Sequence, residues 1–304
     1  MSTVKNSISV LGLGTVLVDQ QMFVKQYPGH NTKNELENHR IQVGGPVPTA
    51  LVFLSRLGLP CSFIGKWADD HFGSFIEKDL QKEGVILDKS IIATGKASGF
   101  ANVWVDTNTG GRTILFTRGT FPPISISERE HVSLQEYTVL HLDGWSGEAA
   151  IKTAQAIKQQ GGTVFLDAGS PKPGLKDLLP LVDVMICPDH FTDDYFHTKN
   201  TRDAVTQLLA NGIHKVIVTH GIDGAELYMD EMHLKQAAFP VQAIDTTGAG
   251  DVFCGGLIYA MSMGYSDKKA LQFASAAAAL KCTKVGNREA LPDLTEIEKL
   301  MRNG

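Results

Sequence analysis

Short apolar runs alternate with amphipathic stretches along most of the chain. Between the runs, apolar residues recur at helical spacing, as in Val47, Leu51 and Leu54, which share one helical face that ends before Gly58. Strands and helices in turn, with roughly 10 to 20 residues between strands, predict βαβ units and a mostly parallel sheet. The predicted strands are 8–11, 61–64, 138–142, 163–166, 182–187 and 215–219. The last three segments, 251–263, 267–281 and 293–302, are predicted to be helices.

Two stretches depart from this alternation. Residues 15–43 contain no apolar helical stripe, and residues 100–105 and 112–116 are alternating runs separated by the turn-forming residues 107–111. The second pattern predicts a β-hairpin. We interpret both stretches as a small β-sheet lid over a cleft, and a plain edge hairpin is the alternative. The division assigns residues 1–14, 43–94 and 119–304 to an α/β core, and 15–42 and 95–118 to the lid.

Composition narrows the functional classes. The 304 residues are 43% hydrophobic and 20% charged, which is typical of a globular protein with a large core. A net charge of −5 without a basic stripe argues against nucleic acid or an anionic membrane as a partner. No apolar run approaches the roughly 20 residues of a membrane span, and residues 1–7 are too polar for a signal peptide, so we expect a cytoplasmic protein. The four cysteines lack zinc-like spacing and are expected to be reduced thiols: Cys61, Cys187, Cys254 and Cys282.

Residues 245–257 contain the motif with the clearest chemistry. The segment begins Asp-Thr-Thr-Gly-Ala-Gly-Asp, follows an expected strand at 241–244 and opens an apolar helix. The small residues 248–250 allow backbone N–H groups to face an anion, and the helix N-terminus adds its positive end. Together these groups can stabilise charge on a transferred phosphoryl group, while Asp251 is placed to accept a proton from an attacking hydroxyl. The alternative is a glycine-rich turn with Asp251 as a helix cap.

This segment closely resembles the second signature of the PfkB, or ribokinase-like, carbohydrate kinases. Residues 43–50 (Val-Gly-Gly-Pro-Val-Pro-Thr-Ala), 64–73 and 219–225 (Thr-His-Gly-Ile-Asp-Gly-Ala) are similar to other stretches of that family, and the likeness extends to Pro292. The resemblance implies a three-layer α/β/α core with a mostly parallel sheet and a small β-sheet lid. It also implies Mg²⁺-assisted transfer of a phosphoryl group from ATP to a sugar hydroxyl, and a homodimer formed through the lid.

The resemblance also assigns roles to individual residues. Asp251 is implied as the catalytic base, and the amides of Gly248, Ala249 and Gly250 as an anion hole. The implied substrate-binding residues are Asp19, Gly44, Gly45 and Arg118. The implied nucleotide-binding residues are Thr219, Gly221, Gly224 and Asn287. Asp245 and Thr247 are implied to hold a monovalent cation, for which K⁺ is the candidate.

The match is imperfect at the sugar and magnesium ends. Pro48 stands where the family usually has Asn, and because proline offers no side-chain hydrogen bond, ordinary ribokinase specificity is in doubt. Arg118-Gly119 and the pair Cys282 and Gly286 resemble ketohexokinase-like members, which favours a ketose or a modified hexose over a pentose. An acidic stretch that shapes the Mg²⁺ water shell in relatives is replaced by 187–193, so no protein ligand of Mg²⁺ is assigned.

Several other functions stay open or are excluded by the sequence. A dinucleotide-binding turn at Gly12 and Gly14 is disfavoured because Leu17 replaces the third glycine, and a Walker P-loop is absent from the sequence. A nucleoside kinase, a sugar-phosphate kinase and a sensor that binds sugar without turnover remain as alternatives. For a nucleoside kinase, an apolar base pocket could be formed by Phe100, Trp104 and Phe116.

Overall fold

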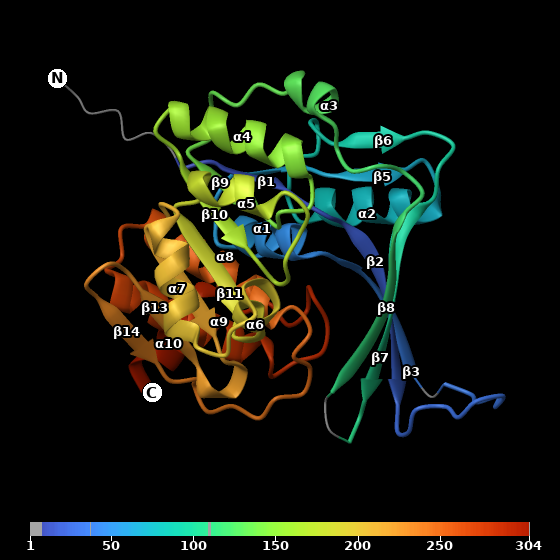
Figure 1. Ribbon diagram of the computed structural model, residues 1–304. Coiled ribbons are helices and arrows are strands. Elements are labelled where there is room, and N and C mark those ends of the chain that lie inside the picture. The colour runs from blue at the N-terminus through green and yellow to red at the C-terminus, as the bar shows by residue number, and fades with distance from the viewer. Residues whose placement is uncertain (1–7, 37, 109–110, 304) are drawn as a thin grey trace.

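The computed structural model describes residues 8–36, 38–108 and 111–303, and its centre is a mostly parallel sheet (Figure 1). The strands of this central sheet are β1 (Val10–Leu13), β4 (Cys61–Ile64), β9 (Val139–Leu142), β10 (Thr163–Asp167), β11 (Val184–Pro188), β12 (Lys215–Thr219), β13 (Ala225–Tyr228) and β14 (His233–Gln236). Their order is β14-β13-β12-β11-β10-β9-β1-β4. The strands from β12 to β4 in this order run parallel, whereas β13 and β14 form an antiparallel edge.

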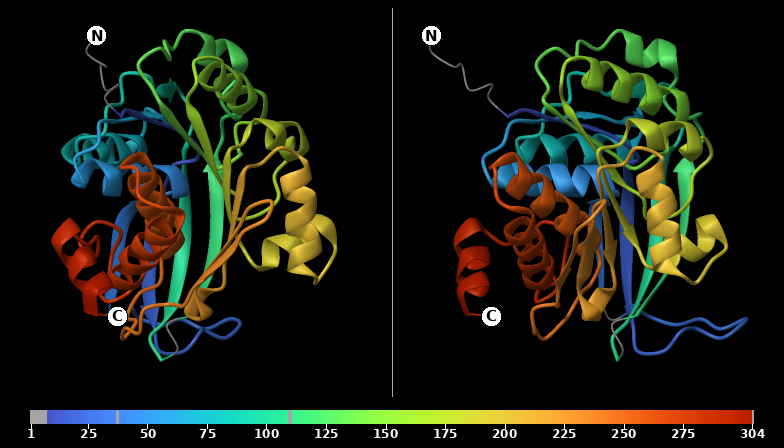
Figure 2. Two further views of the ribbon diagram at one scale, coloured as in Figure 1. Left: turned by 90° about the vertical axis from the view of Figure 1, so that its left-hand side faces the viewer. Right: turned by 60° about the vertical axis from the view of Figure 1, so that its left-hand side comes forward.

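Helices cover both faces of the central sheet, as the views in Figure 2 show. One face carries α1 (Pro46–Arg56), α2 (His71–Lys82), α8 (Ala249–Ser262), α9 (Asp267–Lys281) and α10 (Leu294–Asn303). The other carries α4 (Gly147–Gln159), α5 (Leu175–Leu178), α6 (His190–Phe196) and α7 (Thr201–Ala210), with α3 (Ile126–Glu130) packed on α4. Because successive side chains of a strand point to opposite faces, Phe165 belongs to the first core while Val164 and Leu166 belong to the second.

A second sheet leaves the core beside the carboxyl end of β1. Its strands are β3 (Asn38–Gly44), β2 (Leu17–Val24), β7 (Ser98–Asp106) and β8 (Arg112–Gly119), in that order. The predicted hairpin is confirmed, because β7 and β8 pair antiparallel; part of its expected turn, residues 109–110, lies outside the described residues. β2 pairs in parallel with β7, so the two extended stretches of the sequence form one sheet. A short pair, β5 (Lys66–Ala68) and β6 (Ile91–Ala93), completes the strands among the described residues.

Most predicted elements are confirmed, and one strand is wrong. The predicted strands 61–64 and 215–219 coincide with β4 and β12, and the predicted helix 267–281 coincides with α9. Residues 241–244 form no strand, because they cross from the edge of the sheet to α8 with no neighbouring strand to pair with. Ile244 is 55% exposed, and its N–H donates instead to the carbonyl of Cys282, 2.7 Å away, at the end of α9.

Two expectations from composition can be compared with the described residues. The four cysteines are unpaired, and three of them are buried. Among the described helices, none has the length and apolar character needed to span a bilayer.

Candidate active site

The site begins where α8 starts. Gly248 caps this helix with a φ of 77°, a conformation that strains any residue with a side chain. A Cβ added at Gly250 would meet nothing within 4 Å, so the first turn of the helix faces open space. The first N–H groups of a helix have no partner within it, and they carry its positive end. The helix start is therefore open to an anion.

Asp251 lies in this first turn and is surrounded by other carboxylates. Burial and, to a lesser extent, the charges of Asp167 and Asp19 raise the pKa of Asp251 to about 8, although the charges of Lys281 and Arg112 act in the opposite direction. Burial likewise raises the pKa of Asp19 to about 7 and the pKa of Asp167 to about 6. A carboxylate with a pKa near neutrality can accept a proton at physiological pH and release it afterwards.

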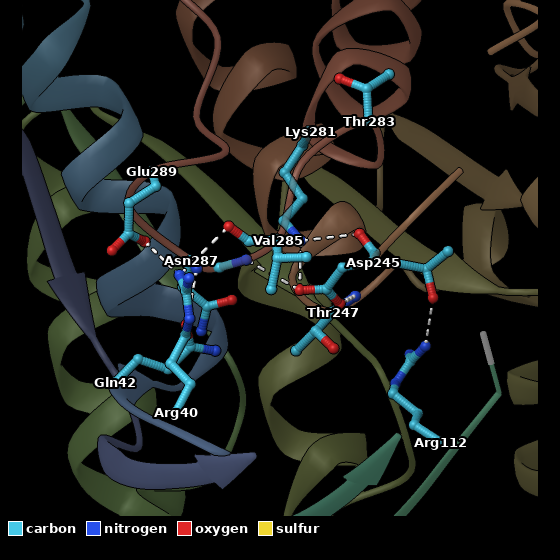
Figure 3. Close-up of polar contacts among 12 residues, drawn as sticks. Arg40, Gln42, Arg112, Asp245, Thr247, Lys281, Thr283, Val285, Asn287 and Glu289 are labelled. Carbon is cyan, nitrogen blue, oxygen red and sulfur yellow. Dashed lines mark hydrogen bonds and ion pairs between the residues drawn. The ribbon is translucent and has the colours of Figure 1, made fainter. Parts of the chain in front are cut away.

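Asp19 brings the second sheet to this helix. The side chain is 8% exposed on β2, and a Cβ at Gly44 would lie 2.3 Å from its Oδ2, so only glycine allows β3 to pass so closely. Asn287 Nδ2 donates to Asp19 Oδ2 at 3.4 Å and to the carbonyl of Val43 at 3.3 Å. The Asn287 N–H donates to Gln42 Oε1 at 2.9 Å (Figure 3). Asn287, predicted to bind nucleotide, thus contacts Asp19, one of the residues expected to bind sugar.

Gly45 and Pro48 form the start of α1 beside this group. Gly45 caps α1 with a φ of 112°, and a Cβ there would lie 2.4 Å from the carbonyl of Thr15 and 3.0 Å from Pro48 Cγ. Pro48 is buried against this turn. The position where the family usually has Asn is therefore filled by an apolar ring close to the Gly44-Gly45 turn.

Arg118 and Lys172 both face the ring of Trp145. Arg118, near the end of β8, places its Cζ 3.3 Å from the ring centroid, and Lys172 Nζ lies 5.4 Å from the same centroid. Arg118 Nε is buried without a hydrogen-bond partner in the described part of the chain. Burial lowers the pKa of Lys172, and the charges of Asp143 and Asp167 oppose that effect. The charge of Asp167 acts on both Lys172 and Asp251, so both groups lie within reach of this carboxylate.

A cavity of about 460 Å³ lies on the other side of the α8 start. Three of the predicted nucleotide-binding residues line it, namely Thr219, Gly221 and Gly224, and Gly250 also lines it. Phe239 and Pro240 contribute an apolar wall. A larger cavity of about 1220 Å³ lies between the far end of the second sheet and residues 243–246, and none of the predicted site residues lines it.

Asp245 and Thr247 lie in the loop that leads into α8. Thr247 N–H donates to Asp245 Oδ1 at 2.9 Å, and Gly286 N–H donates to Asp245 Oδ2 at 3.0 Å. Lys281 Nζ donates to the backbone carbonyl of Asp245 at 3.0 Å (Figure 3). Sequence reasoning missed Lys281, because a lysine in the last turn of a helix is ordinarily explained by the helix dipole.

The second sheet also contacts this loop from its far end. Arg112, the first residue of β8, donates from Nη1 to Thr246 Oγ1 at 2.9 Å. Arg112 therefore lies beside the loop that leads into α8.

A protein family and several known proteins are similar to this chain. The model of the pfkB family carbohydrate kinases matches residues 7–294. The chain is 26% identical to ketohexokinase of Mus musculus over 288 residues, 90% of this chain and 95% of that protein. It is 29% identical to an uncharacterized sugar kinase of Archaeoglobus fulgidus over 246 residues, 79% of this chain and 98% of that protein.

Solved structures show the same fold. The Arabidopsis thaliana ribokinase complexed with ribose and ATP superposes with a TM-score of 0.82 at 24% identity, over 97% of this chain and 99% of that one. The Xylella fastidiosa fructokinase with bound ATP gives 0.81 at 21% identity, over 97% and 98%. The ribokinase-like fold expected from the sequence is confirmed. Because the family model spans nearly the whole sequence, the chain belongs to the pfkB family of carbohydrate kinases.

Proposed function

We propose that this protein transfers the γ-phosphoryl group of ATP to a hydroxyl group of a sugar, with Asp251 as the general base. The observation that carries the proposal is the raised pKa of Asp251 at the open N-terminus of α8. A plain helix cap has no need of a carboxylate held close to its neutral form. The curated relatives include a ketohexokinase and a probable fructokinase, which supports a sugar as the acceptor.

The two sides of the α8 start suggest where the substrates bind. ATP fits the cavity lined by Thr219, Gly221 and Gly224, with its phosphates directed toward Gly250. The sugar fits the opposite side, where Asp19 accepts hydrogen bonds from hydroxyls and Gly44 leaves room for close approach. The amides of residues 248–250 then face the phosphoryl group that passes between the two substrates.

Asp251 takes the proton of the sugar hydroxyl as that oxygen attacks the γ-phosphorus. The bond from the γ-phosphorus to the leaving oxygen of ADP breaks in the same step, and the amides stabilise the charge on the equatorial oxygens. We propose that the second sheet is a lid that excludes water, and Arg112 supports this idea because it reaches Thr246 next to the anion hole.

Mg²⁺ would neutralise the phosphates of bound ATP. Within the described ranges there is no cluster of three His, Cys, Asp or Glu side chains that could hold a metal. Asp189, a residue of the stretch that replaces the acidic motif of relatives, accepts from the N–H of His190 at 2.7 Å and lies 3.6 Å from His220. We propose that phosphate oxygens and water are the main ligands of Mg²⁺ here; Mg²⁺ usually keeps several waters and binds through substrate phosphates and one or two carboxylates.

A sugar that carries a phosphate or carboxylate group is the second candidate acceptor. Arg118 and Lys172 place two cations at Trp145. The buried Arg118 Nε–H has no hydrogen-bond partner among the described residues, so it can donate to a ligand. A planar guanidinium suits a carboxylate or a phosphate. One of the curated relatives is an ATP-dependent ribose-1-phosphate kinase, and another is a 5-dehydro-2-deoxygluconokinase.

A screen of ADP release tests these proposals. Ketoses, aldoses, nucleosides, keto-sugar acids and sugar phosphates are offered with ATP and Mg²⁺, and the Asp251→Asn variant measures background hydrolysis. A sugar that releases ADP only with the unmodified protein supports the proposal. If nucleosides are the only acceptors that cause ADP release, the proposed acceptor is a nucleoside and not a sugar. Sugar binding without any ADP release would indicate a sensor.

We also propose that two copies associate through the lid. The edge strand β8 exposes apolar side chains, with Ile114 at 45%, Leu115 at 62% and Phe116 at 54%. An edge strand with exposed apolar residues readily pairs with another chain. Sedimentation of the protein should show a dimer, and Leu115→Glu should shift it toward a monomer; a monomeric unmodified protein would overturn the proposal.

A further inference from the structure

Lys281 is a fully buried cation beside the anion hole. It is the last residue of α9, and its side chain is 0% exposed. Its Nζ lies 3.0 Å from the carbonyl oxygen of Asp245 and 3.7 Å from Asp245 Oδ2. Figure 3 shows the side chain directed toward Asp245 and Thr247. A lysine is rarely buried in this way unless its charge is paired.

The Asp245 carboxylate is fully compensated from within the chain. Its two oxygens accept the N–H groups of Thr247 and Gly286, and Lys281 supplies a positive charge. The negative charge of this carboxylate therefore already has a counterion inside the fold, 3.7 Å away at Lys281 Nζ.

This arrangement does not fit the monovalent cation that the family resemblance predicts here. A cation such as K⁺ requires a cage of oxygen atoms and a net negative charge. Beside Asp245 and Thr247 the charge is already balanced by Lys281, and a second cation would be repelled at close range. The ammonium group already supplies the positive charge next to the Asp245 oxygens, because its Nζ lies 3.0 Å from the carbonyl oxygen and 3.7 Å from Oδ2.

We propose that Lys281 takes the place of this monovalent cation, so that the protein works without K⁺. The inference rests on the proposed kinase function. Lys281 is a positioning residue: it holds the 245–247 loop through Asp245, and Asp245 in turn holds Gly286. The next residue, Asn287, reaches Asp19, so one buried ammonium group supports both the anion hole and the sugar side of the cleft.

The first test needs only the unmodified protein. Its melting temperature and its rate of ADP release are measured in KCl, NaCl and tetramethylammonium chloride at equal ionic strength. We expect both to be the same in the three salts. A turnover about ten times higher in KCl, or a melting temperature several degrees higher, would show a working K⁺ site and overturn the inference.

The second test removes the ammonium group. Lys281→Ala leaves Asp245 buried without its counterion, which should lower the melting temperature by on the order of 10 °C. K⁺ or NH₄⁺ should restore part of this loss and of the lost turnover, whereas tetramethylammonium, which is too large, should not. A merely structural lysine would give a loss that these ions do not restore, which would contradict the inference.

Two further variants keep the result interpretable. Lys284→Ala removes an exposed lysine three residues later that pairs with Glu296 at 3.3 Å, and it should change neither quantity. Lys281→Met keeps the length of the side chain but fills the site, so K⁺ should not restore it. If Lys281→Ala does not fold, the comparison of salts with the unmodified protein still tests the inference. Since melting temperature needs no acceptor, the inference can fail or hold separately from the kinase function.

Discussion

Two aspartates at the ends of one turn have opposite surroundings. Asp245 receives two N–H donors and the charge of Lys281, and its pKa lies below the usual value. Asp251, six positions later, is surrounded by Asp167 and Asp19, and its pKa rises to about 8. Burial raises the pKa of both carboxyl groups. The difference is that hydrogen bonds and an ammonium group neutralise Asp245, while the Asp251 side chain makes no hydrogen bond or ion pair with the described residues.

This difference suits Asp245 to a structural role and Asp251 to its proposed role as a base. A carboxylate that is already paired gains little from a proton, so Asp245 can hold two loops together but cannot serve as a base near neutral pH. An unpaired carboxylate among like charges takes up a proton readily, which is the property that phosphoryl transfer to a hydroxyl requires. The motif places both residues in one turn, and their partners decide their roles.

The largest expected effect is the loss of the base. Asp251→Asn should lower kcat by roughly 10² to 10⁴, because the sugar hydroxyl loses its proton acceptor. Sugar affinity should stay nearly unchanged, since Asp19 and the Gly44-Gly45 turn are untouched. Steady-state kinetics and calorimetric titration with the sugar measure the two quantities. Full turnover by this variant would remove Asp251 from the mechanism.

Asp245→Asn should act on stability instead. It leaves the Lys281 ammonium buried without its counterion, and the free energy of unfolding should fall by about 3 kcal/mol. The matched control is Glu289→Gln, which breaks an exposed ion pair with Arg40 and should cost less than about 1 kcal/mol. Urea unfolding compares them, and equal losses would show that the buried pair has no special importance.

The raised pKa values predict opposite trends of activity and stability with pH. Below pH 8 the value of kcat/KM should rise about tenfold per pH unit, because Asp251 must lose its proton to act as a base. The folded protein binds this proton more tightly than the unfolded chain does, so stability is greatest below the usual pKa of 3.8 and falls as pH rises through about 8.

Both trends can be followed in one set of buffers. The melting temperature should decrease from about pH 4 to pH 8, with Asp19 and Asp167 contributing at about 7 and about 6. Asp251→Asn should flatten the upper part of this curve. A flat profile for the unmodified protein would mean that the cleft is better hydrated than the structure shows.

The smallest effect concerns the turn between the two aspartates. Gly248→Ala places a side chain at a φ of 77°, which should cost about 1 to 2 kcal/mol of unfolding free energy. Gly250→Ala is helical, its Cβ meets open space, and alanine favours a helix by up to about 1 kcal/mol. Urea unfolding should therefore show a lower free energy of unfolding for Gly248→Ala than for Gly250→Ala. The reverse result would contradict the assigned helix start.

Much of the architecture was predictable from periodicity. Apolar runs such as 61–64 and 215–219 are buried on both faces of the central sheet, so their composition alone indicates a strand. The apolar run 241–244 was misread because its neighbours in space, and not its composition, decide whether it pairs. The hairpin 98–119 was found, but its pairing with β2 depends on residues about 80 positions apart.

The sequence by itself determined the fold class, the family and the turn that begins α8, because short-range patterns of small, apolar and acidic residues indicate each of them. Only the tertiary structure decided which charges meet at that turn. Lys281 is 36 residues from Asp245 and Asn287 is 268 residues from Asp19. Electrostatic interactions act through space, so a carboxylate's partners, and with them its pKa and its role, follow from packing and cannot be read from its neighbours in the chain.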